Sequence, residues 1–424
     1  MKNLKFSDVA KFINDKVELS NLQNEQYIST ENMLPNYGGI VEIDKLPKIE
    51  KCNKFKQGDI LFSNIRTYFK KVWVAEFSGG CSPDVLIIRS KDESIVRTSY
   101  LYLLICSDDF INFTVASSNG AKMPRGDKNA IKNYIFNIPD IAFQDKAINT
   151  YFRFKKKITL NTQTNQTLEQ IAQAIFKHWF IDFAPVHAKA NALARGETIE
   201  QAELAAMACL SGKTAEKITA LKTQDPTTYH QLQQTAAAFP SEFVESEMGL
   251  VPKGWEVKPI NEICSIVYGK GLPKNQLKSS GYPVYGANGV IGYYDQYLYK
   301  TRQVLIGCRG TVGQVYVSQP YSYITSNSLI IEDTKTILNL YFLELYLKNL
   351  DLSVFASGSV QPQITIQNLS RLKIFIPNKE ILDLFSSLVE PMYQLTYKND
   401  DEKKTLSEIR DFLLPKLLNG EIEL

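Results

Sequence analysis

Apolar residues in this chain follow two different periods, and the change from one to the other occurs twice. Residues 1–139 and 251–377 consist mainly of short runs rich in Val, Ile, Tyr and Phe, separated by turns with Gly, Pro and Asn, as in "YPVYGANGVIGYY". Such runs predict β-strands joined by tight turns. The helical stretches "SYLYLLICSDDFINF" and "NLYFLELYLKNL" interrupt them. Each region is therefore expected to be a mixed α/β domain.

After each of these regions, in residues 140–184 and 378–424, apolar positions recur at intervals of three and four. In the first stretch the pattern is carried by Tyr151, Phe154, Ile158, Leu168, Ile171, Ile175 and Trp179. In the second the same spacing links Phe385, Val389, Met392, Thr396, Asn399, Lys403, Leu406, Leu413 and Leu417, of which the three in the middle are polar. This spacing is typical of coiled coils. We expect two long helices that pair antiparallel, along a seam that is apolar at both ends and polar in the middle. Pro391 is expected to kink or begin the second helix.

The two halves of the chain repeat one pattern. Residues of the same kind lie 243 apart in the strand regions: Arg66 and Arg309, Val72 and Val315, Trp73 and Tyr316, Val74 and Val317, Ile88 and Ile331. From Ile138-Pro139 and Ile376-Pro377 onward the interval is 238, and it continues through both helical stretches. One register kept over so many positions predicts an internal duplication with pseudo-twofold symmetry.

Residues 185–250 have no counterpart in the second half and are rich in Ala, Gln, Glu and Thr. They are expected to be an insertion and linker of short surface helices. Across the whole chain of 424 residues the formal net charge is only +3, so any binding of nucleic acid requires local basic patches. The six cysteines are scattered without a CxxC pair, which is typical of a reducing compartment. With no apolar run of membrane-spanning length and no signal peptide, a cytoplasmic location is expected.

Motifs for catalysis are incomplete. The stretch "SGKT" (residues 211–214) ends like a phosphate-binding loop, but Met207 stands where the upstream glycine is required. Asp84 and Lys91 resemble part of a nuclease motif, but Arg89 takes the place of its second carboxylate. The glycines of "GCRGTVG" are wrongly spaced for a dinucleotide turn. No Cys, Asp or Glu lies at ligand spacing from the three histidines, and no methyltransferase signature of the Asn-Pro-Pro-aromatic kind occurs. We expect no metal site, and any chemistry should belong to a partner.

Polar and basic side chains gather at equivalent strand ends and nearby loops of both halves. Arg and Asn can read base edges with paired hydrogen bonds, whereas Lys, Ser and Thr hold phosphates. The candidates for DNA contact in the first half are Ser63, Asn64, Arg66, Thr67, Tyr68, Lys70, Lys71, Lys122, Arg125 and Lys128. Those in the second half are Tyr285, Asn288, Arg309, Thr311, Gln314, Gln361 and Gln363. One such cluster would be an ordinary polar loop, but its duplication favours a binding role.

The chain as a whole resembles the specificity subunit of type I restriction-modification enzymes. The resemblance rests on the order of "GDILFSNIRTYFKKVWVAEFSGGCSPDVLI", "LEQIAQAIFKHWFIDFAPV", "SEMGLVPKGWEV", "VLIGCRGTVGQVYV" and "LLPKLLNGEI". It implies two tandem target-recognition domains, residues 1–139 and 251–377, each reading half of a split DNA site. It also implies that two long antiparallel helices, residues 140–184 and 378–424, separate them. The long insertion, and the absence of a "GLVPKGW" lead-in before the first domain, depart from this pattern.

The resemblance also implies partners. These are double-stranded DNA, two methyltransferase subunits and motor-nuclease subunits, with S-adenosylmethionine, ATP and Mg²⁺ used by the partners and no cofactor in this chain. The helices carry more apolar surface than one seam needs, so docking of the methyltransferase is expected at Phe176, Phe180, Phe412 and Leu418. Two alternatives remain: a catalytic nucleic-acid enzyme with a duplicated binding region, and a coiled-coil adaptor that binds no DNA.

Overall fold

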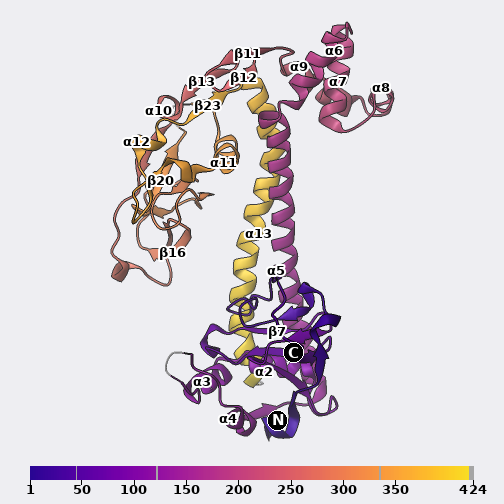
Figure 1. Ribbon diagram of the computed structural model, residues 1–424, viewed down its shortest axis with the longest axis vertical. Helices are drawn as coiled ribbons and strands as arrows, with labels where there is room; N and C mark the ends of the chain where they lie inside the picture. Colours follow the sequence, from indigo (N-terminus) through magenta and orange to yellow (C-terminus); the bar gives the residue numbers. More distant parts are fainter. Residues whose placement is uncertain (44, 121–122, 334–335, 420–424) are drawn as a thin grey trace. The chain divides into compact units, whose positions relative to one another are not determined.

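The computed structural model describes residues 1–43, 45–120, 123–333 and 336–419, and the chain divides into two compact units (Figure 1). Unit 1 comprises Met1–Gln163 and Asn399–Leu424, and unit 2 comprises Thr164–Lys398. Each unit contains a strand-rich domain and parts of both long helices. The mixed α/β class and the duplication predicted from the sequence are confirmed.

Unit 1 is built on two four-stranded sheets and a two-stranded ribbon. The first sheet has the antiparallel order β2 (Ala10–Ile13), β9 (Val85–Ser90), β6 (Ile60–Ser63), β7 (Val72–Val74). The second has the order β3 (Lys16–Glu18), β5 (Lys51–Phe55), β8 (Gly79–Cys81), β4 (Tyr27–Ile28). The ribbon pairs β1 (Lys2–Lys5) with β10 (Ile135–Ile138). The helices are α1 (Phe6–Val9), α2 (Thr98–Ile105), α3 (Asp108–Ala116) and α4 (Lys128–Asn133).

Unit 2 repeats the first sheet and the ribbon. Its four-stranded sheet has the same order, β14 (Ser265–Tyr268), β20 (Ser328–Glu332), β17 (Val304–Gly307), β18 (Val315–Val317). The ribbon pairs β13 (Glu256–Pro259) with β23 (Lys373–Ile376). A further sheet has the order β16 (Gly289–Tyr294), β15 (Tyr282–Gly286), β19 (Tyr323–Ile324). Smaller elements are β11 (Phe243–Ser246), β12 (Gly249–Pro252), α10 (Ile260–Ile263), α11 (Leu340–Lys348), β21 (Ala356–Ser357), β22 (Gln363–Ile364) and α12 (Ile366–Leu369).

The long helices are α5 (Ile141–Phe176), which continues into a π-helical turn at Lys177–Ile181, and α13 (Lys379–Asn419). In unit 1 the Lys157 ammonium lies 3.3 Å from the Glu402 carboxylate, and Asn161 donates a 2.7 Å hydrogen bond to the same group. In unit 2 the side chain of Asn165 donates to the backbone carbonyl of Thr396 at 3.2 Å. Increasing numbers in α5 thus meet decreasing numbers in α13, so the pairing within each unit is antiparallel.

The middle of the seam is polar, as predicted, with Asn161, Asn165 and Asn399 at 3%, 9% and 7% exposure. Buried amides of this kind fix the register of a helix pair. The position assigned to Ile171 is wrong, because its side chain is 41% exposed and Ala172, at 2%, faces the core instead. A helix start at Pro391 is also wrong, since α13 begins at Lys379 and continues past it.

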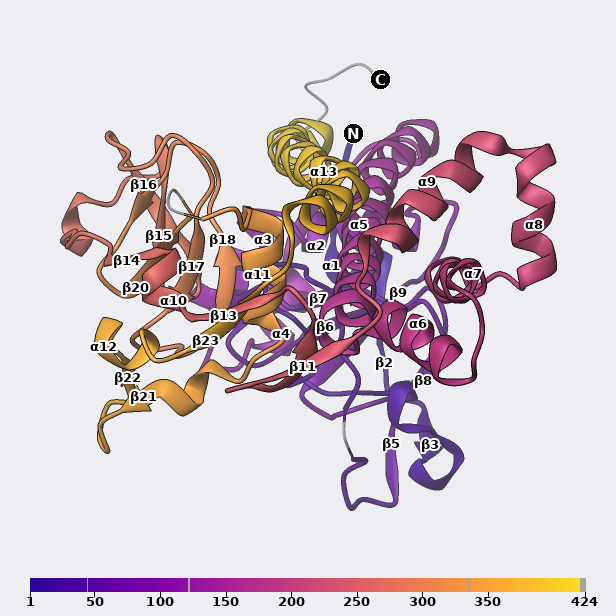
Figure 2. The same cartoon turned by 90° about the horizontal axis from the view of Figure 1, so that it is seen from above.

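Most of the insertion forms four short helices, as expected: α6 (Ala184–Ala194), α7 (Ile199–Ser211), α8 (Ala215–Gln224) and α9 (Pro226–Ala238) (Figure 2). Its last residues instead form β11 and the start of β12. The helices α7, α8 and α9 share a small core that includes Met207, Ile218 and Ala236. The buried Lys189 ammonium donates to the carbonyls of Ala237 and Phe239 at 3.4 and 2.7 Å, which satisfies the C-terminal end of α9.

Candidate nucleic-acid interface

In unit 1 the turn that follows β6 packs against the loop that precedes α4. The backbone N–H of Arg66 donates to the carbonyl of Pro124 at 2.8 Å, and that of Gly126 donates to the carbonyl of Asn64 at 3.1 Å. Two parts of the predicted site, the strand-end cluster and the loop with Arg125, therefore form one surface.

Unit 2 uses the same arrangement. The backbone N–H of Ile364 donates to the carbonyl of Cys308 at 3.1 Å, and the Arg309 side chain donates through Nε to Oε1 of Gln363 at 3.0 Å. The turn and the loop enclose a cavity of about 630 Å³ lined by Arg309, Gly310, Val360, Gln361, Pro362 and Gln363. Three of the predicted residues, Arg309, Gln361 and Gln363, are thus brought together.

The hydrogen bonds correct the alignment of the two turns by one residue. Ile65 forms a bridge with Arg125, and Arg309 forms the equivalent bridge with Gln363. The counterpart of Arg309 is therefore Ile65, and the equivalence of Arg66 and Arg309 inferred from the interval of 243 is wrong. The constant interval failed because the first turn is one residue longer.

The backbone conformation confirms this corrected alignment. Arg66 and Lys70 have φ of 50° and 54°, and their counterparts Gly310 and Gly313 have φ of 82° and 83°. Both turns therefore use the left-handed region at the same two places. Unit 2 does so with glycine, whereas unit 1 does so with two side chains that disfavour it.

Four of the predicted contact residues have buried side chains. Ser63, Asn64, Thr67 and Tyr285 are only 2%, 7%, 2% and 5% exposed, and the hydroxyl of Tyr285 accepts a hydrogen bond from the backbone N–H of Gln319 at 2.9 Å. Their assignment as direct DNA contacts is wrong for this conformation, because a polar residue at a strand end can point inward as readily as outward.

Most of the other predicted residues are accessible, and several are held in place by partners. Lys70 pairs with Asp108 at 2.6 Å, Lys71 donates to the carbonyl of Thr30 at 2.6 Å, and Arg125 pairs with Asp84 at 2.9 Å. Exposed or half-exposed side chains belong to Arg66, Tyr68, Lys70, Lys71, Arg125, Lys128, Asn288, Arg309, Thr311, Gln314, Gln361 and Gln363. Lys122 lies outside the described residues.

Sequence reasoning missed the apolar members of these surfaces. Phe69 lies in the turn of unit 1, and Met123 and Val360 lie in the loops of units 1 and 2, with 40%, 53% and 91% exposure. The correspondence of the two loops was visible in the sequence, because "GAKMPR" and "GSVQPQ" keep the interval of 238 from Gly120 to Gly358, but it does not mark their apolar residues, since Met123 aligns with Gln361. Both glycines have positive φ, 101° and 103°, so the loops begin alike.

The incomplete catalytic motifs have structural roles. Arg89 forms two hydrogen bonds, 2.5 and 2.7 Å long, to the buried carboxylate of Asp59, which raises the pKa of the guanidinium. Asp84 pairs with Arg125. The "SGKT" stretch joins two helices, with Gly212 ending α7 and Thr214 capping α8. Within the described ranges, no group of three His, Cys, Asp or Glu side chains could hold a metal ion, and no helix is long and apolar enough to cross a membrane.

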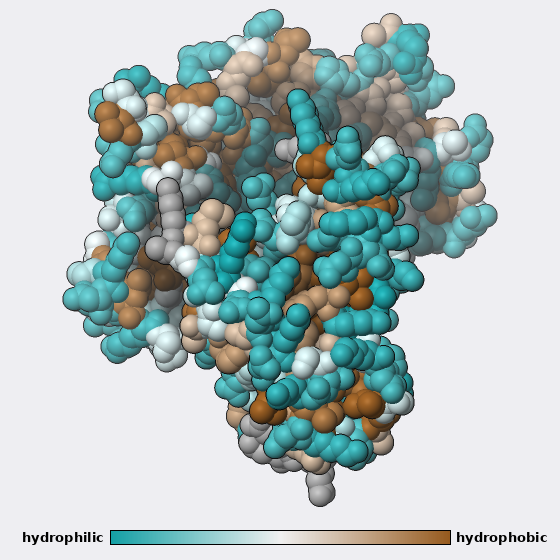
Figure 3. Space-filling view, turned by 60° about the horizontal axis from the view of Figure 1, so that its bottom comes forward, coloured by the Kyte–Doolittle hydropathy of each residue, from teal (hydrophilic) through white to brown (hydrophobic). Residues whose placement is uncertain are grey.

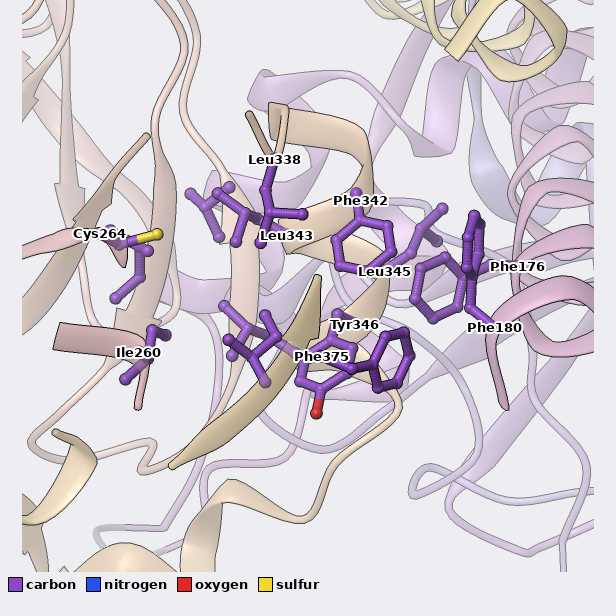
Figure 4. Close-up of a cluster of buried hydrophobic side chains, with 14 of the residues drawn as sticks. Phe176, Phe180, Ile260, Cys264, Leu338, Phe342, Leu343, Leu345, Tyr346 and Phe375 are labelled. Atoms are coloured by element: carbon purple, nitrogen blue, oxygen red, sulfur yellow. The ribbon is translucent and has the colours of Figure 1, made fainter. Parts of the chain in front are cut away.

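The docking residues predicted on the helices are mostly internal. Phe176 and Phe180 are fully buried in the core of unit 2, where their rings contact Phe342 at centroid distances of 5.3 and 5.1 Å (Figure 4). Leu418 is 7% exposed in the core of unit 1. A docking role is wrong for these three residues. The apolar side chains that the helix seam does not use pack against the strand domains instead. Phe412, at 63% exposure, stays available.

The turn and its adjoining loop thus occur once in each unit, so the chain carries two copies of one surface. The model of the type I restriction modification DNA specificity domain matches residues 1–170 and 252–404. A type I restriction enzyme specificity subunit of Haemophilus influenzae is 33% identical, over 99% of both chains. One of Methanocaldococcus jannaschii is 23% identical, over 77% of this chain and 69% of the relative. The fold is similar to that of a type I restriction-modification S subunit from M. genitalium, with a TM-score of 0.58, 15% identity and coverage of 98% and 95%.

The chain belongs to the family of type I restriction-modification specificity subunits. It is the subunit for DNA target recognition, carries two tandem recognition domains, and is not itself catalytic.

Proposed function

We propose that each unit reads one half of a bipartite DNA target through its turn and adjoining loop. The observation that carries this proposal is the recurrence of the same backbone assembly in both units, with accessible Arg side chains in each and accessible Gln and Thr side chains in unit 2. In unit 1 the readers are Arg66 and Arg125, with Lys71 and Lys128 as phosphate contacts. In unit 2 the readers are Arg309, Gln361 and Gln363, with Asn288, Thr311 and Gln314 around them.

The test uses the assembled methyltransferase complex. Selection from random duplexes first gives the target, and Arg66→Ala and Arg309→Ala are then measured on duplexes altered in one half at a time. Since a base-edge contact is worth about 1–3 kcal/mol, each variant should lose discrimination in one half only. Equal weakening on every duplex would make these residues phosphate contacts, and it would contradict the reading role.

The long helices are proposed to dock two methyltransferase subunits. Hydrophilic side chains cover most of the face in Figure 3, and hydrophobic ones form small separate patches. On α13, Leu388 and Leu395 in unit 2 are each 43% exposed, while Ile409 and Phe412 in unit 1 are 38% and 63% exposed. Intervals of seven and three place each pair on one face of the helix. Motor-nuclease subunits would join this assembly for cleavage, and the partners would use S-adenosylmethionine, ATP and Mg²⁺.

The two alternatives from the sequence make different predictions. A coiled-coil adaptor would show no sequence-dependent affinity for DNA in the selection. A catalytic enzyme would act on DNA without partner subunits. The selection with the assembled complex tests the adaptor, and an assay of the isolated chain for action on DNA tests the catalytic alternative.

A further inference from the structure

Two adjacent aromatic side chains lie exposed at the tip of the turn in unit 1. Tyr68 is 48% exposed and Phe69 is 40% exposed, and their ring centroids are 4.7 Å apart with an interplanar angle of 53°. Single exposed apolar residues are common on protein surfaces, but two neighbouring rings on a polar loop are a more specific feature. We refer to Tyr68 and Phe69 as the aromatic pair.

The backbone of the aromatic pair is held on both sides. Arg66, which precedes the pair, donates from its N–H to Pro124 at 2.8 Å. On the other side, the N–H of Asn36 donates to the carbonyl of Phe69, and that of Tyr37 donates to the carbonyl of Lys70, both at 2.9 Å. The rings therefore stand on a fixed support.

This support stores backbone strain. Asn36, Tyr37, Arg66 and Lys70 all have positive φ, between 50° and 60°, and they are four of the six non-glycine residues in the described chain that do. Non-glycine residues in this region persist only where the surroundings impose them, and such strain gathers at functional sites. In unit 2 the same fold of the turn is made with Gly310 and Gly313.

The aromatic pair has no counterpart in unit 2. Three residues, Thr67, Tyr68 and Phe69, separate the left-handed positions of unit 1, whereas only Thr311 and Val312 separate Gly310 from Gly313. The extra residue of the first turn therefore lies in the segment that carries the rings. Because unit 2 forms the equivalent turn without aromatic residues, neither Tyr68 nor Phe69 is needed for the turn to fold.

One cation lies beside the rings, and the adjoining loop carries a second cation and an apolar side chain. The Lys71 ammonium lies 5.9 Å from the centroid of Phe69. The adjoining loop adds the exposed Arg125 and, at 53% exposure, Met123. Cations beside protruding apolar side chains are the chemistry with which proteins enter a stack of bases, because the cations hold phosphates while the apolar groups separate the bases.

We propose that the aromatic pair is a wedge that enters one base step in the half-site read by unit 1. This inference rests on the proposed DNA-reading role of that turn. Bases that lose their stacking on each other gain it on the rings, which compensates for opening the step. The wedge distorts the DNA only in the half read by unit 1, because the equivalent turn of unit 2, between Gly310 and Gly313, carries no aromatic residue.

The experiment uses the full chain assembled with its methyltransferase subunits. Target duplexes carry 2-aminopurine, whose fluorescence rises when it is unstacked, at successive positions of both halves. We expect several-fold higher fluorescence at one step of the half-site that responds to Arg66→Ala. The double substitution Tyr68→Ser and Phe69→Ser should abolish this signal and weaken binding about tenfold.

Two controls accompany the measurement. Tyr321→Ser removes a ring of similar exposure, 49%, in unit 2, and it should change neither signal nor affinity. The base that the methyltransferase flips out gives a second signal, which should persist in every variant and reports an intact complex.

The wedge proposal is wrong if the only fluorescence increase comes from the base that the methyltransferase flips out. It is also wrong if the double variant keeps the fluorescence and affinity of the original protein. Sequence-dependent binding would still stand in that case, so the proposed function would survive. If no sequence preference exists in the half assigned to unit 1, both the wedge and the proposed function fail.

Discussion

Gly313 and Gly310 offer a direct measure of what the left-handed turn costs. Both have φ near +83°, but a Cβ on Gly313 would lie 3.1 Å from the backbone nitrogen of Ser353, whereas nothing lies within 4 Å of a Cβ on Gly310. We expect Gly310→Ala to destabilise the protein by about 1–2 kcal/mol from backbone strain alone. Gly313→Ala should cost more, because Ser353 must move. Denaturant unfolding of both variants gives the two values, and equal losses would contradict the role of the contact.

At the same scale, the sequence predicted residue types better than side-chain directions. The repeated polar cluster lies at the turn and loop, but Ser63, Asn64 and Thr67 point inward. Their polarity gave no sign of this, because direction at a strand end depends on the fold of the turn. Phe69 was overlooked for the opposite reason, since an aromatic residue normally predicts a buried position.

At the level of elements, periodicity was sufficient for both strand domains and the long helices, and composition was sufficient for the helices of the insertion. Periodicity could not give the one-residue difference between the turns, which became visible only through the hydrogen bonds of Ile65 and Arg309. Periodicity also did not show that Phe176 and Phe180, which were predicted to dock the methyltransferase, lie in the core of unit 2. Apolar residues on a long helix can pack in the seam between the helices, against the strand domain or against a partner subunit. Residue type alone cannot distinguish these three roles.

The helix α13 should therefore dock its partner through residues that the seam leaves exposed. We expect the double substitution Leu388→Asp and Leu395→Asp to reduce co-purification with the methyltransferase at least tenfold, because it places charge on an apolar contact. Both side chains are 43% exposed, so folding should be retained and can be checked by circular dichroism. Ile199→Asp, at a residue of 71% exposure on α7, is the matched control. Unchanged co-purification of the double variant would place docking elsewhere.

For the whole molecule, the duplication matters because a single chain then provides two recognition surfaces that differ in detail. The turn of unit 1 has strained backbone and exposed rings, and that of unit 2 has glycines and a hollow beside Arg309. Two copies that diverge in this way can read two different half-sites, while the ribbon and the four-stranded sheet keep the same order in both.

The spacing of those half-sites should depend on the length of the long helices. Inserting four residues after Thr162 in α5 and four after Lys398 in α13, so that the antiparallel pair keeps its register, adds about 6 Å and turns the following segment by about 40°, at 1.5 Å and 100° per residue. One base pair turns DNA by about 35° and lengthens it by about 3.4 Å, so the rotation matches one additional base pair and the extension nearly two. We expect the variant to select the same half-sites with a spacer one or two base pairs longer, measured by selection from random duplexes. An insertion of two residues turns the helix by about 200° and should abolish specific binding. If the variant with four residues assembles but keeps the original spacer, the helices do not set the spacing.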